Sequence, residues 1–271
     1  MWFEKWVIGK RTVDEIAEEK GCSSRTIHRL FKIYLDNPPI PQIKENNSCH
    51  LMIDGTYFGD TCLLNYFDND LKHLQYFELV NKENYIDFKM GLELLTKAGL
   101  YIKTITSDGD RGLIMAINDV LPHVAHQRCL VHIQRMALAY LTRNPKYLAG
   151  KELREIILDV HRVNNHEEKK EWIQRYYNWE TKYYDFLLEK SDSLFESRLY
   201  KHYKIRQTRS IIKNALPNMF HYLDDIKIPK TNNGLESRFS YLKNNLQIHR
   251  GLSKKHRKSF LLWYNWFRYN K

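Results

Sequence analysis

The stretch Leu51-Met52-Ile53-Asp54-Gly55-Thr56 places a carboxylate and a glycine directly after three apolar residues. The apolar run predicts a strand in a covered sheet, and the glycine lets the backbone turn or come close to a ligand. Burying an unpaired aspartate costs roughly 2–7 kcal/mol. Asp54 therefore needs a partner, and the fold is expected to supply one.

Two more carboxylates stand in similar places. Residues 101–109 form a β-rich run that closes on Asp108, and residues 229–236 form a loop that enters a helix with Glu236 in its first turn. Three carboxylates at strand ends and a helix start suit hard divalent cations, which take oxygen ligands. Each also has a structural explanation, because the aspartates could be turn residues and Glu236 could form a capping box with Asn233.

Composition narrows the class of protein. The chain has 271 residues and a net charge of +11, which allows one large or two smaller domains and favours a polyanionic partner. The spacing of the four cysteines indicates a reducing compartment rather than a disulfide framework. The sequence has neither a secretory signal pattern nor a long apolar run, so we expect a soluble cytoplasmic protein without a membrane partner.

Residues 1–36 predict a helix–turn–helix. A helix over 13–20 breaks at Gly21, and a second helix runs over 24–34. The second helix carries cations on its outer side, where they could meet DNA phosphates or base edges: Arg25, Arg29 and Lys32. The alternative is an ordinary helical hairpin with a solvated basic face. Residues 37–48 are rich in proline and polar residues and predict a linker.

The next part of the chain predicts a mixed α/β sheet. Strands are expected over 50–59, 61–67 and 73–80, a helix over 85–98, a strand ending at Asp108, a helix from Arg111 and a strand over 123–128. This order is similar to that of the ribonuclease-H-like fold, in which the first and fourth strands lie side by side. Such a neighbourhood would bring Asp54 and Asp108 into one metal site.

Strand signals end after residue 132. Residues 133–227 predict an all-helical insertion, so the catalytic domain would consist of residues 49–132 and 228–271. The last part of the chain carries further cations that we assign to DNA binding: Arg238, Lys243, Arg250, Lys254 and Arg257. Lys243 lies seven residues beyond Glu236, on nearly the same helix face.

Four motifs together resemble the Mutator-like DDE transposases, including those of bacterial insertion sequences: Asp54-Gly-Thr, Ser107-Asp-Gly-Asp-Arg-Gly-Leu, Gln127-Arg-Cys-Leu-Val-His132 and Thr231-Asn-Asn-Gly-Leu-Glu236. The resemblance covers residues 50–250. It implies that Asp54, Asp108 and Glu236 are the catalytic triad and that Cys129 and His132 are the family's cysteine–histidine pair beside the active site. Asp110 is the main rival to Asp108 as the second carboxylate of the triad. Cys129 and His132 could instead be half of a zinc site.

The resemblance implies a metal-dependent enzyme that cuts and joins DNA. We expect two Mg²⁺ or Mn²⁺ ions, the terminal inverted repeats and target DNA as partners, a homodimer, and association with a bacterial nucleoid. Two alternatives stay open. One is a metal-dependent nuclease or resolvase of the same superfamily, and the other is a domesticated DNA-binding regulator that uses only the N-terminal helices.

Overall fold

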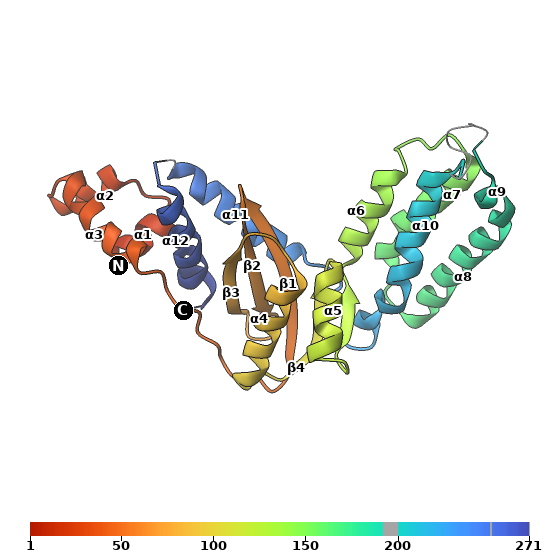
Figure 1. Ribbon diagram of the computed structural model, residues 1–271, viewed down its shortest axis with the longest axis horizontal. Helices are drawn as coiled ribbons and strands as arrows, with labels where there is room; N and C mark the ends of the chain where they lie inside the picture. Colours follow the sequence, from red (N-terminus) through yellow and green to blue (C-terminus); the bar gives the residue numbers. More distant parts are fainter. Residues whose placement is uncertain (192–199, 250, 271) are drawn as a thin grey trace. The chain divides into compact units, whose positions relative to one another are not determined.

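Five strands form a single sheet in the computed structural model, which describes residues 1–191, 200–249 and 251–270 (Figure 1). Their order across the sheet is β3-β2-β1-β4-β5. The strands are β1 (Cys49–Phe58), β2 (Thr61–Asp68), β3 (His73–Val80), β4 (Ile102–Ser107) and β5 (Ala125–Arg128). All five predicted strands are present, and the mixed α/β class is confirmed.

The first three strands form an antiparallel meander. β1 pairs with β2, and β2 pairs with β3. β1 and β4 are neighbours, as the sequence predicted. They also begin side by side, because the Cys49 amide donates to the Tyr101 carbonyl at 2.9 Å.

The chain divides into two compact units. The first contains residues 1–105, 109–124 and 232–271, and the second contains residues 106–108 and 125–231. The first unit therefore holds β1, β2 and β3, and the second holds the helical block.

In the first unit, one face of the sheet is covered by α4 (Tyr85–Lys97) and α5 (Arg111–Val120). Leu51 and Ile53 point to this side and pack in a cluster with Phe88 of α4 and Leu113 of α5. Side chains alternate along a strand, so the residues between them belong to the opposite face. Both faces being covered explains why β1 reads as an apolar run.

The opposite face is covered by C-terminal elements, namely α11 (Asn233–Ile248), α12 (Lys254–Asn265) and the π-helical turn η4 (Trp266–Asn270). Met52 packs in one cluster with Leu235 and Phe239 of α11. Phe58 packs in another with Leu242 and Leu246, further along the same helix. α11 therefore runs along β1, from Met52 to Phe58.

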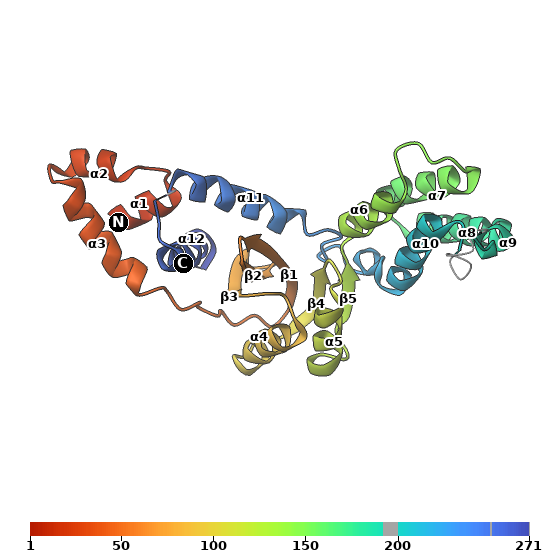
Figure 2. The ribbon, with the colours of Figure 1, turned by 45° about the horizontal axis from the view of Figure 1, so that its top comes forward.

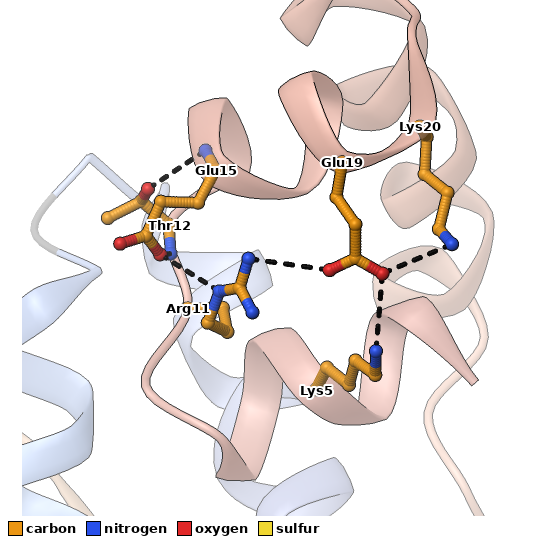
Figure 3. Close-up of polar contacts among 6 residues, drawn as sticks. All are labelled: Lys5, Arg11, Thr12, Glu15, Glu19 and Lys20. Carbon is orange, nitrogen blue, oxygen red and sulfur yellow. Dashed lines mark hydrogen bonds and ion pairs between the residues drawn. The ribbon is translucent and has the colours of Figure 1, made fainter.

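The N-terminal helices are α1 (Trp2–Ile8), α2 (Val13–Lys20) and α3 (Ser24–Asp36). Gly21 ends α2 with φ +62°, as the sequence predicted, and Thr12 forms a capping box with Glu15. Glu19 of α2 forms ion pairs with Lys5, Arg11 and Lys20, and the pair with Lys5 joins α2 to α1 (Figure 3). The three helices share a core with α11 and α12, beside which both ribbon views draw them (Figure 2).

The second unit is built from helices around a core of its own. They are α6 (Leu130–Tyr140), α7 (Leu148–Asp159), α8 (His166–Lys182), α9 (Tyr184–Leu188) and α10 (Tyr203–Ala215), with 3₁₀ turns η1 (Val160–Arg162), η2 (Leu216–Asn218) and η3 (His221–Leu223). Trp172, Tyr176 and Trp179 of α8 are buried and belong to this core, whereas Tyr177 is exposed. Within the described residues, no helix combines the length and the apolar character that crossing a bilayer requires.

Candidate active site

Asp54 lies in the interior of β1. It pairs with Asn65 of β2, and four further strand residues follow it. The alternative of Asp54 as a turn residue is therefore wrong. The side chain is half-buried, and its Oδ1 accepts the Gly55 amide at 3.0 Å. It occupies the same face as Met52 and Phe58, which is the face covered by α11.

Gly55 is required by the opposite face of β1. A Cβ at this position would collide with Glu83 Oε1 and would lie 2.9 Å from Cys62 Sγ. The glycine that follows the aspartate therefore makes room for a second carboxylate rather than for a turn. Glu83 is a half-buried residue on the face of β1 opposite Asp54, and sequence reasoning did not single it out.

The start of α11 is fixed to β1 by Asn232. This buried side chain donates from Nδ2 to the Ile53 carbonyl at 3.0 Å, directly before Asp54. Asn232 is the residue before the helix, and the α11 start has no side-chain capping hydrogen bond. The capping box between Asn233 and Glu236 is therefore wrong. Glu236 is in the first turn, half-buried, and next to Leu235, which packs with Met52.

These contacts bring Glu236 to the part of β1 that carries Asp54. Both residues belong to the first unit. At the start of α11, two contacts join the helix to β1: Asn232 binds Ile53, and Leu235 packs with Met52. At the other end, Lys243 Nζ lies 5.8 Å from the Phe58 ring centroid.

Asp108 and its rival Asp110 occupy different positions. Asp108 directly follows β4, is half-buried and belongs to the second unit. Asp110 belongs to the first unit and caps α5, where its Oδ1 accepts the amides of Gly112 at 2.7 Å and Leu113 at 3.2 Å. The helix start thus accounts for Asp110.

Arg128 is a second residue that sequence reasoning missed. It ends β5, is 8% exposed, and donates from Nη2 to the Asp108 carbonyl at 3.0 Å. Burial lowers the pKa of Arg128, and attraction to Asp108 opposes that shift. Nε has no hydrogen-bond partner among the described residues. Its place at the end of the predicted strand 123–128, within the Gln127-Arg-Cys motif, was the sequence signal that could have identified it.

Ser107, the last residue of β4, is bound to β5. Its Oγ lies 2.7 Å from His126 Nε2. Burial, mainly, and the nearby Arg128 lower the pKa of His126 to about 3, so the imidazole is neutral near pH 7. This neutral hydrogen bond holds the segment that leads into Asp108.

Cys129 and His132 lie at the start of α6. Cys129 is buried, and its amide donates to the Ser107 carbonyl at 2.7 Å. His132 is half-buried in the first turn. Across the parts of the chain that the structure describes, no three or more His, Cys, Asp or Glu side chains are grouped so that they could hold a metal ion.

The residues assigned to DNA binding differ in their surroundings. Arg25, Arg29 and Lys32 are exposed on α3, opposite buried Ile27 and Phe31. Arg238 is enclosed by rings, with its guanidinium carbon 4.0 Å from the Phe67 centroid and 4.3 Å from that of Tyr269.

The other cations of this group lie further along the chain. Lys243 and Arg257 are exposed, and Lys254 forms an ion pair with Asp60 at 3.8 Å. Arg250 lies outside the described residues.

Comparison with protein families gives the class, because the description "Transposase, Mutator family" matches residues 73–219, which is more than half of the chain. The chain belongs to the Mutator family of transposases, and its role is in transposition of DNA. The match includes Asp108 and Arg128. No curated protein matches the chain.

Proposed function

We propose that this protein is a DDE transposase that cuts the ends of an insertion sequence and joins them to target DNA. In this proposal Asp54, Asp108 and Glu236 hold two Mg²⁺ ions. The observation that carries it is the Asn232–Ile53 hydrogen bond, which fixes the start of α11 beside Asp54 in a chain of the Mutator family.

The donor set fits the metal. All three side chains offer carboxylate oxygens, which Mg²⁺ and Mn²⁺ prefer. β1 and β4 are neighbours that begin side by side, so we expect the residue after β4 to complete the set. A pair of such ions stabilises the attacking and the leaving oxygen of a phosphodiester.

The protein's own residues would position the DNA. We propose that the exposed cations of α3 contact the terminal inverted repeats in the manner of a helix–turn–helix, because they lie opposite the buried side of that helix. Lys243 would hold a phosphate two turns from Glu236. Two copies of the chain would hold the two ends of the element.

Asparagine and glutamine variants test the triad. DNA carrying the element's ends is incubated with Mn²⁺ and the full chain, and both strand cleavage and joining are measured. We expect D54N, D108N and E236Q to lose cleavage by about a thousandfold or more, because each removes a metal ligand. D110N is the matched control and should keep activity, since asparagine caps a helix as well as aspartate does.

Two outcomes would contradict the proposal. Full joining by D54N or E236Q would exclude their carboxylates from catalysis. Cleavage without joining, lost in the same variants, would identify a nuclease of the same superfamily instead.

A further inference from the structure

A hollow of about 410 Å³ opens in the first unit, at the far end of α11 from Glu236. It lies between the end of β1, the second half of α11 and the start of α12. The residues that matter for its chemistry are Phe58, Lys243, Leu246, Gln247, His249 and Arg257. Its volume falls within the range of small-molecule sites, about 300–1,000 Å³.

The hollow combines an apolar floor with a cationic rim. Phe58 and Leu246 are buried, whereas Lys243 and Arg257 are exposed. Neither cation forms an ion pair with any described carboxylate, although Lys255, two residues before Arg257, is paired to Asp36 at 2.7 Å. Two cations beside an apolar surface suit a ligand that has both a phosphate and a flat apolar part.

One ring nitrogen of His249 has no hydrogen-bond partner among the described residues. Its side chain is 9% exposed and lies against Trp6 and Phe260, with ring centroids 4.5 and 4.9 Å away. Among the described residues its Nε2 has no hydrogen-bond partner. Burial lowers its pKa to about 4, against a hydrogen bond to the Trp6 backbone that raises it, so the ring is neutral at pH 7. Because the other ring nitrogen donates to the Trp6 backbone, Nε2 is a hydrogen-bond acceptor.

The position of the hollow relates it to the proposed catalytic residues. Lys243 is seven residues from Glu236, about 10.5 Å along the helix. Phe58 is four residues from Asp54, about 13 Å along the strand. Duplex DNA rises by about 3.4 Å per nucleotide along its axis, so these spans correspond to about three or four nucleotides of one strand.

We propose that this hollow binds one unpaired nucleotide of the DNA strand, about three or four nucleotides from the phosphodiester that is cut. The phosphate contacts Lys243 and Arg257, the base packs on Phe58 and Leu246, and a donor on the base edge binds His249 Nε2. A duplex could not place a base in a hollow of this size, so the nucleotide must be out of the helix stack. This inference rests on the proposed function for its substrate.

The test measures DNA binding without catalysis. The full chain carrying D54N is titrated with a fluorescent twelve-nucleotide oligothymidylate, with a twelve-residue abasic strand of the same charge, and with a duplex. We expect K243A and R257A each to weaken oligothymidylate binding by about tenfold and to reduce the salt slope by about 0.7 per lost phosphate contact. K258A, an exposed cation on α12 outside the hollow, is the matched control and should change affinity by less than about twofold.

The abasic strand separates a nucleotide site from a phosphate site. We expect it to bind about tenfold more weakly than oligothymidylate to the D54N protein, since one stacked base contributes about 1–3 kcal/mol. Equal binding of the two strands would show a phosphate contact only and would overturn the proposal, as would K243A and R257A behaving like K258A. Unchanged cleavage and joining by the triad variants, with these binding differences intact, would reject the proposed catalytic triad and leave the nucleotide site standing.

Discussion

Arg128 carries the most unusual charge beside the proposed catalytic residues. A buried guanidinium is costly unless its hydrogen bonds and a nearby negative charge compensate. Here one N–H binds the Asp108 carbonyl, and the Asp108 carboxylate supplies the attraction. The arrangement suits a positioning residue that fixes Asp108 through both its backbone and its charge.

We expect R128A to reduce DNA cleavage by about 10- to 100-fold, the usual effect of losing a partner that orients a metal ligand. The Mn²⁺ concentration for half-maximal cleavage should rise as well, and R128K should restore part of both losses because it keeps the charge. R143A, an exposed arginine of the same unit, is the control. An unchanged Mn²⁺ requirement in R128A would assign Arg128 a purely structural role.

At the scale of single elements, the start of α11 could not be predicted from local sequence patterns. The strands and most helices could be predicted because alternation, helical periodicity and capping residues act over a few positions. Two consecutive asparagines precede the glycine of α11, and either could begin the helix. The choice is made by the Ile53 carbonyl, 179 residues earlier in the chain, which binds Asn232. No local pattern contains that contact.

Asn232 and Asn233 provide a matched pair of variants. We expect N232A to lower the free energy of unfolding by about 1–3 kcal/mol, because the buried Ile53 carbonyl loses its donor. Cleavage should also fall, since Glu236 is no longer held beside β1. N233A, which changes an exposed neighbour, should alter stability by less than about 0.5 kcal/mol.

Chemical denaturation measures the free energy of unfolding of N232A and N233A, and the cleavage assay measures their activity. Equal behaviour of N232A and N233A would mean that the Ile53 contact does not position α11.

Across the whole chain, the N-terminal helices were predicted as a separate domain behind a linker. That boundary stays a prediction, and residues 38–46 have no regular secondary structure. The helices nevertheless share a core with the C-terminal elements. Trp6 packs on Phe260, and Trp263 donates to the Tyr34 carbonyl at 2.8 Å. Contacts between residues over 200 positions apart leave no trace in local periodicity, so the sequence could not predict this shared core.

A pair of tryptophans in α1 tests whether this core is a single cooperative structure. Trp6 is 4% exposed and Trp2 is 40% exposed. We expect W6A to lower stability by about 3–5 kcal/mol, and W2A by less than about 1 kcal/mol, because only the first leaves a cavity. Amide hydrogen exchange followed by mass spectrometry gives the location of the effect. W6A should speed exchange in α12 as well as in α1 to α3, whereas faster exchange confined to residues 1–36 would mean that the N-terminal helices open on their own and act as an independent DNA-binding module.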